Sequence, residues 1–326
     1  SKALIADRED IGSTTGSIWR LDVAGATPPK QLNAPAPKAR VLANDLSPDG
    51  RLLAVTSNQK GGIDQAAVMD VASGRLTWLA PTPWEQSSGS FSPDGASITF
   101  ATDADGRQDI SIYGLKTGKA LKAPLPDGFN AEAGGSSSPF TADGRLLVGH
   151  DASNTPFDYW VLDRAGKAAR LTNFAAPGLE PDRLPVSQIV HYKSQDGTVI
   201  SAILMVPFNL NRDGTAPGVV VPHGGPTGQT TDHFSRLAVA LSSRGYLVIQ
   251  PNPRGSTGYG EAFQKANHKD LGGGDLIDEV YAAKFLTATG YVNPKKIGIT
   301  GGSYGGFMTL MAVGKTPDVW AAGVSM

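Results

Sequence analysis

The chain has 326 residues, of which 40% are hydrophobic and 18% charged, and its formal net charge is -1. This length suffices for two domains of ordinary size, and the composition is that of a soluble globular protein. The small charge gives no reason to expect nucleic acid or an anionic membrane as partner, and no apolar run is long enough to span a bilayer. The absence of cysteine excludes disulfides, thiol catalysis and thiolate metal sites. The chain starts at Ser1 without a signal-like segment, so its compartment stays open, with the cytoplasm slightly favoured.

The first half of the sequence contains a repeated phrase. It reads Leu-Ser-Pro-Asp-Gly-Arg at 46–51, and closely similar phrases follow at 91–96 and 140–145. Pro-Asp-Gly favours a tight turn, because proline presets its φ angle, aspartate can bond its own backbone and glycine accepts positive φ. A strand-like run follows each copy, and a second apolar phrase interleaves with it at 18–23, 67–71, 110–114 and 159–163. The unit is therefore expected to be a set of antiparallel strands joined by tight turns.

A period in the mid-to-upper forties with about four strands per copy predicts the blades of a β-propeller. A β-sandwich with repetitive turns is the alternative. Three to four copies precede Gly178, fewer than a propeller usually needs to close, so the chain is expected to start part-way through the propeller. The proline-rich segment 171–187 is interpreted as a linker. We therefore expect a partial β-propeller domain at 1–185 and the N-terminal part of an α/β domain at 186–326.

The second half alternates strands with helices. A hairpin is expected from 188–192 and 198–207, and helices are expected at 234–243 and 275–287. Further strands are expected at 218–221, 246–249, 297–300 and from 321 onward. This alternation predicts a mostly parallel sheet with helices on both faces and a site at the carboxyl ends of its strands.

The sequence Gly-Gly-Ser-Tyr-Gly at 301–305 joins a predicted strand to an apolar, helix-prone segment. A serine on such a turn has a strained backbone, so the residues two before and two after it must be small, as Gly301 and Gly305 are. The pattern predicts that Ser303 is a nucleophile presented at the edge of the sheet. A serine that only caps a helix is the alternative.

A second glycine loop, Pro-His-Gly-Gly-Pro at 222–226, follows the predicted strand 218–221. Backbone amides in such a loop can face a developing negative charge. We expect the amides of Gly225 and Tyr304 to form an oxyanion hole, with Gly224 as the rival to Gly225. His223 is expected to support this loop by hydrogen bonding rather than to act as a base. A glycine turn shaped by the neighbouring prolines is the alternative.

A third loop, Pro-Asn-Pro-Arg-Gly-Ser-Thr-Gly-Tyr-Gly at 251–260, invites interpretation as a phosphate cradle. It lacks the lysine of a P-loop and does not complete G-x-G-x-x-G, so no phosphate-bearing cofactor is predicted. Arg254 is instead expected to pair with an acid such as Asp275 and to brace the loop. The remaining histidines show no metal-ligand spacing, and no metal is predicted: His150, His191, His233 and His268.

Together these motifs resemble the prolyl oligopeptidase family of serine peptidases. The repeat is followed, in the family's order, by His-Gly-Gly-Pro at 223–226, Asn-Pro-Arg-Gly-Ser-Thr-Gly-Tyr-Gly at 252–260, Gly-Gly-Gly-Asp at 272–275 and Gly-Gly-Ser-Tyr-Gly-Gly at 301–306. The acylaminoacyl-peptidase and dipeptidyl-peptidase branch is the most similar, and the likeness covers nearly the whole chain. It implies an α/β-hydrolase peptidase whose propeller admits only short peptides. Ser303 matches the nucleophile, and Gly225 and Tyr304 match the oxyanion donors.

The resemblance also exposes a gap. In an α/β-hydrolase the nucleophile is followed along the chain by an acid and then a histidine, but here only Asp318 follows Ser303 and no histidine does. Without a base the hydroxyl is a poor nucleophile. We therefore expect a family member truncated at both ends and inactive as given, whose complete form acylates Ser303 with a histidine beyond Met326 as base.

A serine peptidase acting on short peptides, including N-acylated ones, is the favoured function. A serine esterase on the same scaffold is the second hypothesis, because acyl transfer to serine does not itself separate amides from esters. A non-catalytic propeller that binds a partner is the third. A short peptide is the expected partner, and homo-oligomerisation is left open.

Overall fold

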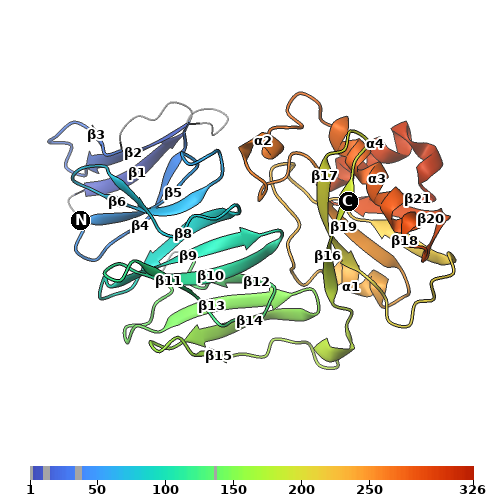
Figure 1. The fold of residues 1–326 in the computed structure, drawn as a ribbon, viewed down its shortest axis with the longest axis horizontal. Helices are drawn as coiled ribbons and strands as arrows, with labels where there is room; N and C mark the ends of the chain where they lie inside the picture. The colour runs from blue at the N-terminus through green and yellow to red at the C-terminus, as the bar shows by residue number, and fades with distance from the viewer. Residues whose placement is uncertain (1–2, 10–14, 34–38, 136–137) are drawn as a thin grey trace. The chain divides into compact units, whose positions relative to one another are not determined.

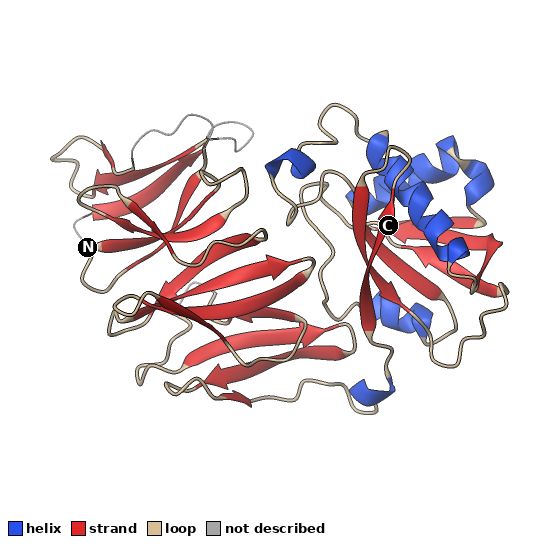
Figure 2. Ribbon diagram, in the orientation of Figure 1, coloured by secondary structure: helices blue, strands red, loops and turns tan. Residues whose placement is uncertain are grey.

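The structure is a computed structural model that describes residues 3–9, 15–33, 39–135 and 138–326 (Figure 1). The chain forms two compact units. The first comprises Ser1–Ala104, Gln108–His150 and Asp158–Thr172, and the second comprises Asp105–Arg107, Asp151–Phe157 and Asn173–Met326. Among the described residues, the helices all lie in the second unit, whereas the first is built from strands and turns (Figure 2). The predicted domain boundary between 185 and 186 stays a prediction. No described helix is both long and apolar enough to cross a membrane.

The first unit consists of strands that mostly pair with their neighbours in sequence. One sheet contains β1 (Ala3–Glu9), β2 (Gly16–Asp22) and β3 (Lys30–Gln31), and another contains β4 (Val41–Leu46), β5 (Leu52–Ser57), β6 (Gln65–Asp70) and β7 (Leu76–Trp78). The largest sheet contains β8 (Glu85–Phe91), β9 (Ser97–Ala104), β10 (Arg107–Gly114), β11 (Lys119–Lys122), β12 (Phe129–Glu132), β13 (Leu146–Ala152), β14 (Thr155–Leu162) and β15 (Ala168–Arg170). In it β8–β11 and β12–β15 are joined by a parallel pairing of β10 with β12. The expected grouping by fours is therefore visible three times, while closure into a propeller stays a prediction.

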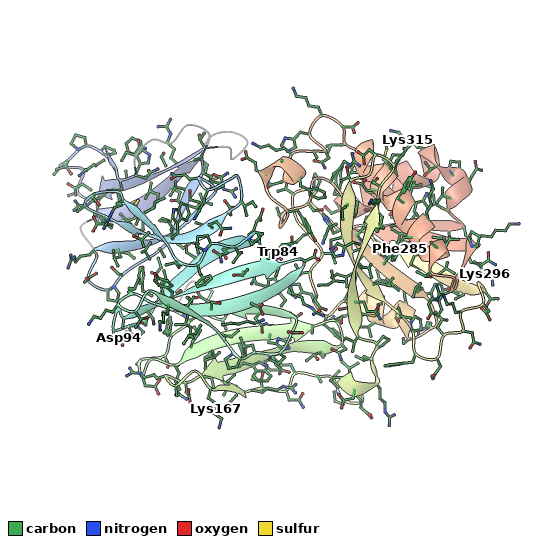
Figure 3. All side chains as sticks on the ribbon, viewed as in Figure 1. Trp84, Asp94, Lys167, Phe285, Lys296 and Lys315 are labelled. Carbon is green, nitrogen blue, oxygen red and sulfur yellow. The ribbon has the colours of Figure 1, made fainter. Side chains whose placement is uncertain are left out.

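The three copies of the repeated phrase form the same turn. Asp49 Oδ1 accepts hydrogen bonds from the hydroxyl of Ser47, at 2.7 Å, and from the amide of Arg51, at 3.1 Å. Asp94, labelled in Figure 3, is held in the same way by Ser92 and Ala96. Asp143 accepts from the hydroxyl of Thr141, and hydrogen bonds of this kind lower the pKa of all three carboxyls. The predicted local bonding of the turn aspartate is thus confirmed.

The second unit contains one six-stranded sheet with the order β16-β17-β19-β18-β20-β21. Its strands are β16 (Ser187–Lys193), β17 (Val199–Met205), β18 (Ala216–Val220), β19 (Leu247–Asn252), β20 (Val292–Gly301) and β21 (Ala322–Ser325). The expectation of a mostly parallel sheet needs correction, because this sheet is mixed. β16 and β17 form a hairpin, and β17 runs antiparallel to β19. The part from β19 to β21 is parallel, as predicted.

Helices cover both faces of this sheet, as the alternation predicted. Helices α3 (Gly274–Ala288) and α4 (Tyr304–Lys315) pack in one apolar cluster with Leu204, Leu247 and Ile249. Helix α1 (Arg236–Ser242) packs in another with Met205 and Val248, and the side chains of adjacent strand residues point to opposite faces. A short helix, α2 (Glu261–Gln264), was not predicted. The parallel strands therefore end at one edge, where the loops that follow β18 and β19 and the turn that follows β20 come together.

Candidate active site

Ser303 lies on a sharp turn between β20 and α4. Its backbone has φ 55° and ψ -121°, a conformation that residues with a side chain rarely adopt. Such a residue costs of order 1–3 kcal/mol and persists only where the surrounding structure enforces it. Here its amide donates to the carbonyl of Met326, at 3.0 Å, and its carbonyl accepts from the amide of Phe307, at 3.0 Å. The side chain is exposed, so the predicted strain and presentation of this serine are both confirmed.

The glycines on either side of Ser303 make room for the loop after β18. A Cβ atom added at Gly301 would lie 2.7 Å from the carbonyl oxygen of Pro222, and one added at Gly305 would lie 2.3 Å from the same atom. Both distances are far below van der Waals contact, so neither position accepts even alanine without moving the backbone. The expected need for small residues at these two positions is confirmed, and it arises from the loop as well as from the turn.

The loop that follows β18 passes directly beside the serine. A Cβ added at Gly224 would stand 3.6 Å from Cβ of Ser303 and 4.0 Å from its Oγ. Gly225 has φ 131°, and a Cβ there would lie 2.7 Å from the amide nitrogen of Thr227, so this position requires glycine. Tyr304, the second expected oxyanion donor, is the first residue of α4, where backbone N–H groups lack an acceptor within the helix. The loop and the helix terminus thus flank Ser303, and the roles of the three amides stay predictions.

His223 holds the same loop through both of its ring nitrogens. Nδ1 lies 2.6 Å from the carbonyl oxygen of Gly224, and Nε2 lies 2.9 Å from Oγ of Ser256. Burial lowers the pKa of this imidazole, which favours the neutral ring. These two contacts link the 222–226 loop to the loop after β19, and the hydroxyl of Ser256 also donates to the carbonyl of Pro253, at 2.6 Å.

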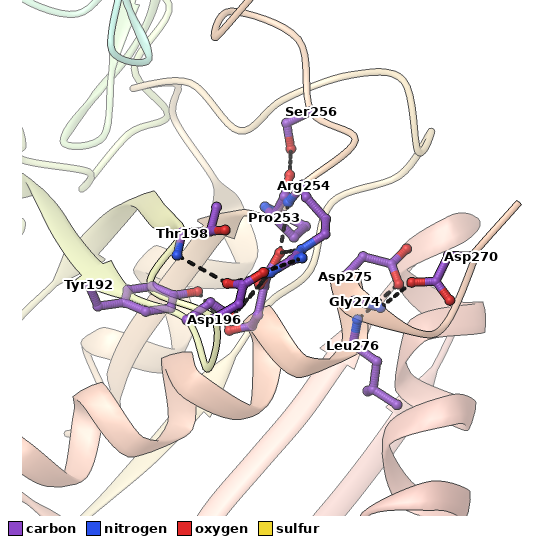
Figure 4. Close-up of polar contacts among 12 residues, drawn as sticks. Tyr192, Asp196, Thr198, Pro253, Arg254, Ser256, Asp270, Gly274, Asp275 and Leu276 are labelled. Atoms are coloured by element: carbon purple, nitrogen blue, oxygen red, sulfur yellow. Dashed lines mark hydrogen bonds and ion pairs between the residues drawn. The ribbon is translucent and has the colours of Figure 1, made fainter. Parts of the chain in front are cut away.

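The structure corrects the expected partner of Arg254. Its guanidinium pairs with Asp278 through Nε, at 2.9 Å, and Nη2, at 2.8 Å, and with Asp196 through Nη1, at 2.9 Å, rather than with Asp275 (Figure 4). The two carboxylates raise the pKa of Arg254 further above its usual range. In turn, the hydrogen bonds from Arg254 hold the pKa of Asp196 well below the usual value of an aspartate. Asp278 lies one helical turn beyond Asp275 on α3 and faces the loop. Arg254 therefore braces the loop as expected, but against other acids.

Asp275 has a different set of partners. Its Oδ2 accepts a hydrogen bond from the phenol of Tyr304, at 2.5 Å, and its Oδ1 accepts from the amides of Gly272 and Leu276, both at 2.9 Å. The residue is fully buried. This contact was not predicted from the sequence. Two acids, Asp275 and Asp278, lie three positions apart on a predicted helix, and this spacing indicated that each acid needs a partner of its own.

Glu279, the third acid of α3, is fully buried, and neither of its carboxyl oxygens has a hydrogen-bond partner. Desolvation, and then the charges of Asp278 and Asp275, raise the pKa of Glu279 well above its usual value. Burial therefore favours the neutral form of this carboxyl. It was not singled out from the sequence, because nothing in the local pattern distinguishes a buried glutamate from one on the exposed face of a helix.

Among the residues that the structure describes, no hydrogen bond joins a histidine to Ser303. The ring of His191 contacts Asp105 and that of His233 contacts Asp151, while His150 contacts Asn130. Within the same described ranges, no group of three or more His, Asp or Glu side chains is arranged to hold a metal ion. The site therefore consists of a presented hydroxyl flanked by backbone amides.

A serine on a strained strand-to-helix turn, at the carboxyl edge of parallel strands, is the device on which α/β-hydrolases carry their nucleophile. The sequence comparisons point to a family for this part of the chain. Residues 232–326 match the model of the prolyl oligopeptidase family.

The relatives are longer proteins. The chain is 30% identical over 297 residues to dipeptidyl aminopeptidase BIII of Pseudoxanthomonas mexicana, which covers 86% of this chain and 42% of that protein. It is 26% identical over 251 residues to the acylamino-acid-releasing enzyme of Mus musculus, covering 72% of this chain and 33% of the relative. The structure of Porphyromonas gingivalis dipeptidyl peptidase 4 has the same fold, with a TM-score of 0.82 and 21% identity over 99% of this chain and 47% of that one. The chain thus spans less than half of the length of these relatives.

Proposed function

We propose that the protein is a serine peptidase that cleaves short peptides through an acyl-enzyme at Ser303. The observation that carries the proposal is the geometry of Ser303 itself. Its side chain is exposed on a strained turn, and the Gly224 backbone passes close enough for an added Cβ to stand 4.0 Å from the hydroxyl oxygen. Strain of this kind is typical of functional sites, and here the glycines at 301 and 305 are required to keep it.

In the proposed reaction, Oγ of Ser303 attacks the carbonyl carbon of the scissile peptide bond. The hydroxyl proton passes to a general base while the carbonyl oxygen becomes negatively charged, and the amides of Gly225 and Tyr304 donate hydrogen bonds to that oxygen. Collapse of the intermediate breaks the C–N bond, and the base returns the proton to the leaving amine. Water then hydrolyses the ester at Ser303 by the same steps and restores the hydroxyl.

We propose that the base is a histidine other than His150, His191, His223 and His233, whose rings already make hydrogen bonds. Both ring nitrogens of His223 are already occupied by Gly224 and Ser256, which supports a positioning role for that residue. The remaining histidines that contact acids or amides lie in hydrogen bonds of their own. The acid that orients the base is likewise proposed to be a residue other than Asp275 and Asp278, whose oxygens are already paired.

We propose that the substrates are short peptides from which a short N-terminal segment is released. The names of two relatives support this, since one is a dipeptidyl aminopeptidase and the other an acylamino-acid-releasing enzyme. Whether the N-terminus of the substrate is free or acylated separates these two activities. We also propose that the sheets of the first unit are blades of a propeller, supported by their grouping in fours.

The test uses the full-length protein with a fluorophosphonate probe. We expect the probe to label Ser303, as mapped by peptide mass spectrometry, and Ser303→Ala to abolish both labelling and turnover. Dipeptidyl anilides, N-acetyl-aminoacyl anilides and short acyl esters are then compared by kcat/KM. Turnover of esters alone would favour an esterase, and unchanged turnover in Ser303→Ala would overturn the proposal.

A further inference from the structure

The turn before α3 is fastened to one face of α4, the helix that begins next to Ser303. Tyr304, Phe307, Met311 and Lys315 lie along this face. The phenol of Tyr304 donates to Asp275, and at the other end of the helix the Nζ of Lys315, labelled in Figure 3, donates to the carbonyl of Gly272, at 3.0 Å. A Cβ added at Gly272 would lie 2.7 Å from Cε of Met311, so the turn packs directly on the helix between these two bonds.

Asp275 is a rigid acceptor for the phenol. The residue is fully buried, and both of its carboxyl oxygens are occupied, one by Tyr304 and the other by the amides of Gly272 and Leu276. A carboxylate that accepts three hydrogen bonds from two elements cannot rotate without breaking at least one of them. The hydroxyl of Tyr304 is therefore fixed relative to the core of the second unit.

The fixed phenol is the side chain of Tyr304, and the backbone amide of the same residue lies next to Ser303. Tyr304 follows Ser303 directly, and its amide is one of the two proposed oxyanion donors. Ser303 has φ 55°, a conformation that relaxes unless its neighbours hold it. Two backbone bonds, to Met326 and Phe307, hold the serine itself. The phenol of Tyr304 adds the nearest side-chain anchor on the helical side of the turn.

We propose that Asp275 is a positioning residue that acts through the phenol of Tyr304, holding the Tyr304 amide and the Ser303 backbone in the geometry needed for acyl transfer. This inference rests on the proposed function. It assigns to the Gly-Gly-Gly-Asp segment at 272–275 a part in the site that does not require contact with substrate. The pKa of Tyr304 is raised by burial and by Asp275, so the phenol keeps its proton and continues to donate.

The test is Tyr304→Phe in the full-length protein, which removes one oxygen and leaves the amide in place. We expect kcat and the rate of fluorophosphonate labelling to fall about tenfold with KM unchanged. That is less than the hundred- to thousandfold loss typical when an oxyanion donor is removed outright. Asp275→Asn, which leaves an oxygen that can accept from the phenol, is expected to keep more activity than Asp275→Ala.

Tyr192→Phe is the matched control. The phenol of Tyr192 is buried and donates to α3, to the carbonyl of Asp278 at 2.9 Å, but Tyr192 lies on β16 and does not adjoin Ser303 in the chain. We expect Tyr192→Phe to lower stability without lowering kcat. Equal kcat values for wild type, Tyr304→Phe and Asp275→Ala would overturn the positioning role, as would equal losses in Tyr304→Phe and Tyr192→Phe. If Tyr304→Phe does not fold, the two Asp275 variants decide by the same criterion. Activity that survives Ser303→Ala would instead refute the proposed function.

Discussion

Replacing Arg254 by alanine should destabilise the second unit strongly, because it leaves Asp278 buried without its counter-charge. Asp278 is fully buried and accepts two bonds from the guanidinium, one from the amide of Arg254 and one from the hydroxyl of Ser194. The variant removes the two charged bonds and keeps the other two. Breaking a buried ion pair by removing one partner typically costs about 3–5 kcal/mol. We expect Arg254→Ala to fall in that range.

The same arginine supplies a control. Asp196 pairs with it from the turn between β16 and β17, but its side chain is half exposed. An exposed pair contributes little, because water and salt screen it. Asp196→Asn should therefore leave the free energy of unfolding almost unchanged. Adding Asp278→Asn to Arg254→Ala should recover part of the loss, because the buried charge is then gone.

The assay is chemical denaturation combined with amide hydrogen exchange of the segments 194–198 and 253–256. The exchange data are needed because a chain of two units need not unfold in a single step. We expect faster exchange in both segments in Arg254→Ala and in neither segment in Asp196→Asn. A loss of stability in Arg254→Ala no larger than that in Asp196→Asn would refute the reasoning.

Three further predictions concern the glycine turn and two buried groups. Gly305→Ala places a Cβ against the Pro222 carbonyl and should reduce fluorophosphonate labelling of the full-length protein at least ~100-fold, while Gly314→Ala, whose added Cβ meets nothing within 4 Å, should label normally. Glu279 has a raised pKa in the folded state, so the unfolded chain loses this proton first as pH rises above about 4.3, and the folded state loses stability until the pH passes the folded-state pKa. The urea midpoint of Glu279→Gln should therefore depend less on pH than that of wild type. His223 has a lowered pKa in the folded state, so the unfolded chain takes up this proton first as pH falls below about 6.5, and the folded state loses stability. Between pH 8 and pH 5 the melting temperature of His223→Gln should therefore fall less than that of wild type. An equal fall in both proteins would exclude a buried neutral imidazole at this position.

The elements that carry the site could be predicted from the sequence because their signals are local. The strand at 297–300, the turn around Ser303 and the apolar helix after it lie within twenty residues, and the structure has them as β20 and α4. The hydrogen bonds of the turn aspartates in the first unit were equally predictable, since Asp49 bonds residues only two positions away. In each case, the residues that determine the conformation are neighbours in the chain.

Partner choice was less predictable because it depends on how distant elements pack. Asp275 and Asp278 are both within reach of any loop near the start of α3, and the sequence does not show which one faces Arg254. The answer depends on the hairpin turn at 194–197, whose Ser194 and Asp196 complete the arginine's surroundings. The mixed sheet has the same origin, since the antiparallel placement of β17 beside β19 is a long-range pairing.

Gly224 differs from Gly225, Gly301 and Gly305 in a way that concerns how the site can change over evolution or by design. Side chains at Gly225, Gly301 and Gly305 would collide with backbone atoms, whereas the Cβ of an alanine at 224 would meet only ordinary contacts, the nearest at 3.6 Å. A residue introduced there would project toward the hydroxyl of Ser303 without rebuilding the loop. Position 224 is therefore a natural place to narrow, shield or reshape the approach to the serine while its supporting backbone stays intact.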